Sequence, residues 1–240
     1  MAAHFRHSLV LTYALPAGLL EPLLPPGLRP DTYRDDGFVA VAVVDTRALR
    51  PAFLPERLGR DYLLTGYRIF ARHGRAMRGL YILRSDTANR LMAVAGNLLT
   101  RYRYHTSAAT LTERAGSVEV EIETAGGEAD LSMVADLDGP PAPLPASSPF
   151  SDLRGARRYA GPLPYTFDYE PETGSLLAVK GVRHGWDPRP VAVEVRRCSF
   201  LERAPFAAGK PRLAQAFYVG AVDYRWERGR LLAATDAVDA

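Results

Sequence analysis

Five consecutive residues, Arg101 to His105 (Arg-Tyr-Arg-Tyr-His), carry the most versatile chemistry of the chain. Successive side chains of an extended segment point to opposite faces, so Tyr102 and Tyr104 share one face. Arg103 and His105 share the other. If Arg103 and His105 point into a pocket, they place a titratable group beside an anion-binding guanidinium. If the tyrosines point inward, the pocket is aromatic with hydroxyl tips. A third interpretation is a strand with an aromatic packing face and a solvated basic face.

Three further residues are candidates for ligand contacts. Arg68 lies in a predicted strand at residues 62–71, and a buried arginine needs either a carboxylate partner or a ligand. Both a structural ion pair and a ligand contact meet that need. His184 and Trp186 follow a predicted strand at residues 176–182. They form either a ligand contact or, as we prefer, a loop anchored by the tryptophan with the histidine hydrogen-bonded beside it.

Composition excludes several classes of function. Nucleic-acid binding needs a clustered basic face, and a net charge of only +3 is weak evidence for one, so we expect no nucleic-acid partner. His4 and His7 are not followed by a second cluster of Cys, His or acidic residues, so we expect no metal. Glycine-rich nucleotide-binding motifs are missing, and we expect no cofactor. No run approaches the roughly 18 apolar residues of a membrane span, so we expect a soluble protein.

Cysteine and lysine usage adds two expectations. Cys198 is the single cysteine, so an intrachain disulfide is impossible, which favours a cytoplasmic location. We interpret Cys198 as a small buried hydrophobic residue rather than a nucleophile. Lys180 and Lys210 are the chain's two lysines among 30 Lys and Arg residues. Lys180 lies in the predicted strand at 176–182, where an exposed position is the expected one.

Strand patterns dominate the chain. Residues 38–44 form a near-continuous apolar run, typical of a strand buried on both faces. Residues 118–123 alternate Val or Ile with Glu, which predicts one dry and one wet face. Further strands are predicted at 8–15, 62–71, 77–83, 131–137, 165–169, 176–182, 191–195 and 216–226. Short helices are predicted at 15–24, 88–99 and 150–159, the second capped by Asp86 or Thr87.

These elements predict one α+β domain over residues 1–240, mostly antiparallel and barrel-like. The Pro- and Ala-rich residues 138–149 are interpreted as a long surface loop inside that domain rather than a linker. Residues 235–240 are interpreted as a frayed tail.

Several patches, in the same order, resemble one protein family. They include Pro25–Leu28, the hairpin at Tyr67–Phe70 and Arg78–Leu83, the segment Asp86–Tyr104, and His184–Trp186. The chain resembles the YqjF-like set of uncharacterised bacterial proteins, within the acetoacetate-decarboxylase-like superfamily. The resemblance covers roughly residues 8–228 and implies a β-rich, cone-like barrel with a central small-molecule pocket. It also makes a homo-oligomer an open possibility.

The departures from the family pattern affect the expected chemistry. Where the decarboxylases carry paired lysines, this chain has Tyr104 and His105, and neither side chain can form the iminium that acts as an electron sink. We therefore expect a lysine-independent enzyme acting on a small oxo or carboxylic compound. In it, Arg68 or Arg103 would hold an anion, and His105 or Tyr104 would move a proton. The alternative is a non-catalytic binder, and a Schiff-base enzyme using Lys180 is a third, weaker hypothesis.

Overall fold

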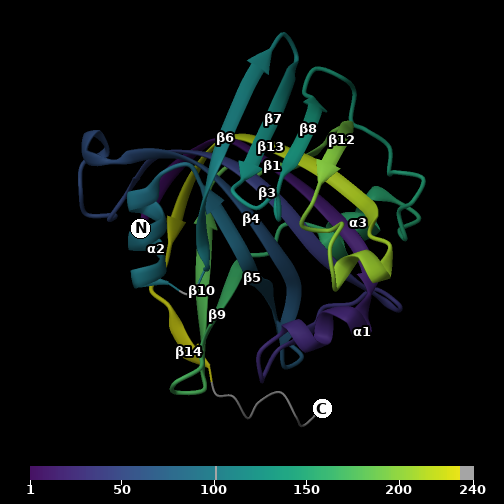
Figure 1. Cartoon of the computed structure of the whole chain (residues 1–240), viewed down its shortest axis with the longest axis horizontal. Helices are drawn as coiled ribbons and strands as arrows, with labels where there is room; N and C mark the ends of the chain where they lie inside the picture. Colours follow the sequence, from purple (N-terminus) through teal and green to yellow (C-terminus); the bar gives the residue numbers. More distant parts are fainter. Residues whose placement is uncertain (101, 233–240) are drawn as a thin grey trace.

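A closed ring of strands forms the centre of the molecule (Figure 1). The computed structural model describes residues 1–100 and 102–232. Around the ring, β5 pairs with β9, then follow β10, β13, β1, β3 and β4, and β4 pairs back with β5. The ring strands are β1 (Ala2–Pro16), β3 (Asp36–Arg50), β4 (Arg60–His73), β5 (Met77–Thr87), β9 (Tyr165–Glu170), β10 (Ser175–Arg183) and β13 (Arg212–Trp226).

A second layer of strands branches from the ring at β5. It runs in the order β6, β7, β8 and β12, and β6 pairs with β5 in parallel. These strands are β6 (Tyr104–Arg114), β7 (Ser117–Thr124), β8 (Leu131–Asp136) and β12 (Val193–Cys198). Short strands β2 (Arg29–Pro30), β11 (Arg189–Pro190) and β14 (Arg230–Leu232) pair with β4, β13 and β10. Among the described pairings, those of β5 with β6 and with β9 are parallel and the others antiparallel, which confirms the predicted mostly antiparallel α+β barrel.

The three short α-helices of the described residues overlap the predicted segments, and the third ends one residue beyond its predicted range. They are α1 (Ala17–Leu20), α2 (Arg90–Leu99) and α3 (Leu153–Ala160), with 3₁₀ turns η1 (Glu21–Leu23), η2 (Glu56–Leu58) and η3 (Phe206–Gly209). The predicted cap of α2 is wrong, because Asp86 and Thr87 still belong to β5. Instead, the side chain of Asn89 accepts a hydrogen bond of 2.9 Å from the backbone N–H of Met92.

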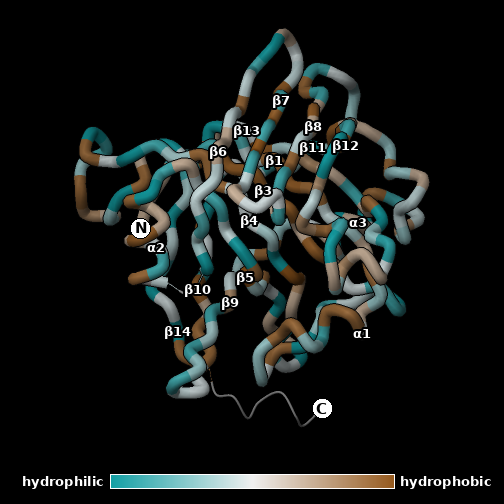
Figure 2. The backbone as a smooth tube through the Cα atoms, viewed as in Figure 1, coloured by the Kyte–Doolittle hydropathy of each residue, from teal (hydrophilic) through white to brown (hydrophobic). Residues whose placement is uncertain are grey.

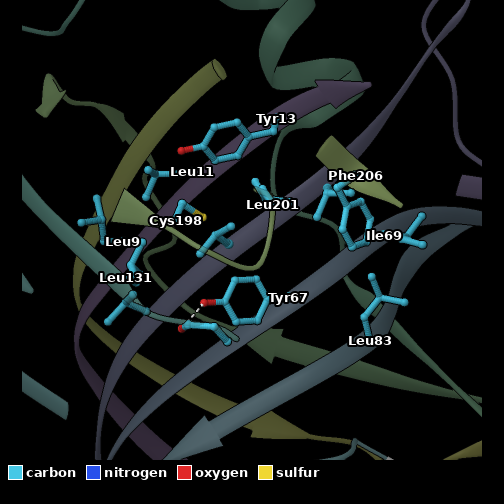
Figure 3. Close-up of a cluster of buried hydrophobic side chains, with 14 of the residues drawn as sticks. Leu9, Leu11, Tyr13, Tyr67, Ile69, Leu83, Leu131, Cys198, Leu201 and Phe206 are labelled. Carbon is cyan, nitrogen blue, oxygen red and sulfur yellow. Dashed lines mark hydrogen bonds between the residues drawn. The ribbon is translucent and has the colours of Figure 1, made fainter. Parts of the chain in front are cut away.

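The ring strands use both faces. On β3, Val39, Val41 and Val43 pack into the main core, whereas Ala40 and Ala42 point to the inside of the ring. The main core fills the space between the ring and the branching layer (Figure 3). There, the hydroxyl of Tyr67 on β4 donates a hydrogen bond of 3.0 Å to the carbonyl of Ala129. Burial on both faces explains why residues 38–44 read as a continuous apolar run.

The branching layer follows the alternating pattern of its sequence. Along β7, hydrophobic and hydrophilic positions alternate, and the former are buried (Figure 2). Gly127, with φ of 66°, turns the chain toward β8.

Residues 138–149 contain no helix or strand. The predicted frayed tail at 235–240 lies outside the described residues, and among the described helices none is long and apolar enough to cross a membrane.

The reactivity of the Cys198 thiol tests how the main core packs. Its side chain is buried against the main core, and burial raises the pKa of its thiol to about 12. The thiol therefore stays protonated at neutral pH, and we expect it to be inert to a thiol-specific reagent in the native protein. Labelling with a chromogenic disulfide at pH 8 should give no fast phase until a denaturant is added. Rapid labelling without denaturant would contradict this packing.

Candidate functional site

The inside of the ring holds a cavity of about 130 Å³. Each ring strand contributes to its wall. Most of the lining is apolar and includes Phe5, Val10, Ala42, Val44, Leu64, Phe70, Leu80, Ile82, Phe217 and Trp226. Two charged groups line it within the described part of the chain, Arg68 and Arg183, and that part supplies no Asp, Glu, His, Lys or Cys to the wall.

Arg68 reaches the cavity from the inner face of β4. It lies deep in the protein, and its guanidinium folds back over Gly66, where a Cβ atom would come within 3.0 Å of Nε. Buried Nε has no hydrogen-bond partner, and Arg68 makes no ion pair with a carboxylate among the described residues. Burial lowers the pKa of Arg68, while the nearby tyrosines 224, 104 and 102 act in the opposite direction. The guanidinium is thus a buried cation without a counter-ion from the described protein.

Arg183 brings a second cation to the cavity from the end of β10. Its guanidinium lies 4.2 Å from the ring centroid of Trp186, a cation–π contact. Its hydrogen bond to the carbonyl of Pro162 is long, at 3.5 Å. Burial lowers the pKa of Arg183, and Tyr224 opposes that shift. The indole Nε1 of Trp186 is also buried without a hydrogen-bond partner in the described residues.

Three tyrosines line the cavity together with the guanidinium groups. Burial raises the pKa of Tyr102, Tyr104 and Tyr224, although Arg68 lowers it in each case. Their hydroxyls therefore stay protonated at neutral pH and can donate hydrogen bonds. The rings of Tyr102 and Tyr104 lie 6.5 Å apart. The ring of Tyr224 stacks on that of Phe5 at 4.6 Å.

Glycines and one asparagine position these tyrosines. A Cβ atom on Gly96 of α2 would lie 2.4 Å from the ring of Tyr104, so α2 can approach only because Gly96 lacks a side chain. On the same helix, Asn97 holds the backbone of Tyr104 twice. Its Oδ1 accepts from the Tyr104 N–H at 2.7 Å, and its Nδ2 donates to the Tyr104 carbonyl at 2.8 Å. A Cβ atom on Gly181 would lie 1.7 Å from the hydroxyl of Tyr224.

The structure decides between the two faces of the Arg101–His105 segment. Tyr102 and Tyr104 line the cavity. Arg103 and His105 are exposed and do not line it. Arg103 donates a hydrogen bond of 3.3 Å to the hydroxyl of Tyr81, and His105 lies opposite Asp86 across the β5–β6 pairing. The predicted roles of Arg103 and His105 stay predictions, and this placement gives them no support. Arg101 lies outside the described residues.

The remaining predicted residues divide between the inside and the outside of the ring. Trp186 lines the cavity, whereas His184 is exposed and borders a surface hollow near His4 and Asp223. Lys180 is exposed, with its Nζ 3.9 Å from a carboxylate oxygen of Glu227. Lys210, the other lysine, is exposed as well. No lysine amine therefore lines the cavity.

Sequence reasoning missed Arg183 and Tyr224. Alternation along a strand was the available signal: on β10, Gly181 and Arg183 fall on the inner face and Lys180 on the other. The sequence pattern does not say which face is interior, so it led to Lys180 as a candidate and not to Arg183. Within residues 1–100 and 102–232, no group of His, Cys, Asp and Glu is placed to hold a metal ion.

A family model covers residues 2–223 of the chain. The chain belongs to the DUF2071 family, described as uncharacterized conserved proteins. No curated protein sequence matches it. The DUF2071 description states no activity.

Solved structures confirm the acetoacetate-decarboxylase-like fold. The acetoacetate decarboxylase of Legionella pneumophila is similar at a TM-score of 0.61 and 13% identity, covering 97% of this chain and 88% of that one. An acetoacetate decarboxylase-like enzyme from Sphingomonas wittichii is similar at 0.59 and 17%, covering 96% and 92%. The enduracididine biosynthesis enzyme MppR, complexed with pyruvate, is similar at 0.60 and 13%, covering 97% and 91%. At these identities, the likeness shows the fold alone.

Gly181→Ala tests how the tyrosine at the cavity is positioned. The added methyl group collides with the hydroxyl of Tyr224, whose ring is held by Phe5. Overpacking of this kind costs about 1–3 kcal/mol, so the free energy of unfolding should fall by that amount. Chemical denaturation measures it. Gly18→Ala is the matched control, because a Cβ atom there meets nothing within 4 Å. Equal effects of the two substitutions would contradict the proposed packing.

Proposed function

We propose that the cavity binds a small organic anion, a carboxylic or oxo acid. One observation carries this proposal: Arg68 lies buried at the cavity wall without a carboxylate partner among the described residues. Burying an unpaired cation costs several kcal/mol, whereas a bound anion would restore the missing interaction. A carboxylate fits the planar guanidinium donors.

The walls and the size of the cavity restrict the class of ligand further. Apolar side chains such as Phe70, Leu80 and Phe217 favour a ligand with carbon next to its charged group. A volume of about 130 Å³ is smaller than the cavities of drug-sized ligands, so the ligand is a small acid. The complex of the similarly folded MppR with pyruvate supports this class, since pyruvate is a small oxo acid.

A lysine-independent enzyme is the second candidate, and the cavity tyrosines favour it. The hydroxyls of Tyr104 and Tyr224 stay protonated beside Arg68, so either one can give a proton to a carbanion or enolate formed on a bound oxo acid. The described lining offers no carboxylate or imidazole that would take a proton. This second candidate is therefore limited to reactions, such as loss of carbon dioxide, that need a proton donor but no base. To test this candidate, the parent protein and the variants Tyr104→Phe and His105→Ala are each incubated with small oxo acids. NMR of each mixture then compares the variants with the parent.

A Schiff base involving Lys180 receives no support from the geometry, because this amine is exposed and faces Glu227. Borohydride should trap no carbonyl compound on the chain. A cytoplasmic location and assembly into a homo-oligomer remain proposals. The former rests on the single cysteine and the latter on the family resemblance. We expect neither nucleic acid nor membrane as a partner.

Arg68→Met separates a binding role from a structural one. If Arg68 serves the ligand, replacing this unpaired buried cation with an apolar side chain should raise the free energy of unfolding of the ligand-free protein by about 1–3 kcal/mol. The same variant should lose the calorimetric binding of butyrate, a small carboxylate. Arg230→Met, at an exposed position, is the control and should change neither. A variant that is destabilised and still binds butyrate would contradict the proposal.

A further inference from the structure

Every unpaired buried side-chain polar atom of the cavity wall in the described chain is a hydrogen-bond donor. The two atoms are Nε of Arg68 and Nε1 of Trp186. Arg and Trp side chains have no acceptor. Arg183, stacked on Trp186, has a single long hydrogen bond, to the carbonyl of Pro162. The ligand must therefore supply acceptors to both places on the wall.

The two positive charges at the cavity wall also require a ligand with acceptors at both places. Two guanidinium groups face the cavity, and no carboxylate of the described residues lines it. A monocarboxylate would neutralise one of them and leave the other without a counter-ion among the described residues of the wall, which is a costly state. Arg68 and Arg183 come from different strands, β4 and β10, and both act electrostatically on Tyr224. Both arginines and Tyr224 line the same cavity of about 130 Å³, so a short molecule can reach both cations.

Resting on the proposed function of the cavity, we propose that its ligand is a short dicarboxylate. One carboxylate lies on Arg68 and the other on Arg183 and the indole N–H of Trp186. The carbon chain between them packs against the apolar wall of the ring, which inorganic phosphate, a compact dianion, cannot do. The hydroxyl of Tyr224, which also lines the cavity, donates a hydrogen bond to an oxygen of one of the two carboxylates.

Isothermal titration calorimetry with matched acids tests the second carboxylate. Succinate is compared with butyrate, and glutarate with pentanoate, so each pair shares its chain length. Inorganic phosphate is included. We expect at least one dicarboxylate to bind about tenfold or more tightly than its partner acid, since each charge-assisted pair is strong. We expect phosphate to bind more weakly than that dicarboxylate.

Three variants locate the second carboxylate. Arg183→Gln should remove the roughly tenfold advantage of the dicarboxylate and change the affinity for the monocarboxylate less than about threefold. Trp186→Phe keeps an aromatic ring under Arg183 but lacks the N–H, and should lower the advantage in part. Arg230→Gln makes the same change at an exposed position and should leave it intact. Circular dichroism of each variant verifies the fold.

The outcomes distinguish this inference from the proposed function. Equal binding of both members of each pair, lost in Arg68→Met, overturns the dicarboxylate and leaves the anion site standing. Phosphate binding as tightly as the better-binding dicarboxylate overturns the carbon-chain argument. A dicarboxylate advantage that survives Arg183→Gln overturns the assignment of the second carboxylate. No binding of any acid by the folded parent protein overturns both proposals.

Discussion

Two guanidinium groups that face one cavity, with no carboxylate partner among the described residues, are the constraint on which the cavity depends. Arg68 and Arg183 both lie on the inside of a closed ring of strands, within a mostly apolar wall. Elsewhere the described chain pairs its buried arginine closely. Arg84, for instance, holds Asp86 through contacts of 2.7–3.0 Å. The contrast indicates that the missing acids at the cavity are a property of the site, since stability alone would favour partners or apolar residues.

The ring can hold such a site without losing its packing, because its strands bury two faces and each face has a separate role. The outer face joins the branching layer in a packed apolar core, with Tyr67 and Ile69 of β4 fully buried there. That core holds the strands while the inner face stays partly hollow. Glycines at positions 66, 96 and 181 then give Arg68, Tyr104 and Tyr224 their space. Stability and binding thus depend on different faces of the same strands.

The fold was predictable from the sequence because it rests on local patterns. Alternation at residues 118–123 and the apolar run at 38–44 marked strands that the structure contains. The cavity was harder to predict because period two gives two faces without saying which is inside. Tyr102 and Tyr104 were therefore recognised together with Arg103 and His105, although these two pairs lie on opposite sides. The pattern did not single out Arg183, since this end of β10 pairs with β13, which is distant in sequence, and periodicity carries no such information.

The state of the Arg68 guanidinium tests the account most directly. Protein labelled with ¹⁵N-arginine gives a separate NMR signal for a buried Nε–H, and loss of one signal in Arg68→Lys identifies it. Titration with glutarate should shift this signal with the affinity measured by calorimetry, because the carboxylate becomes its missing acceptor. Binding of glutarate without a shift of the Arg68 signal would show that the anion lies elsewhere and would contradict the central claim.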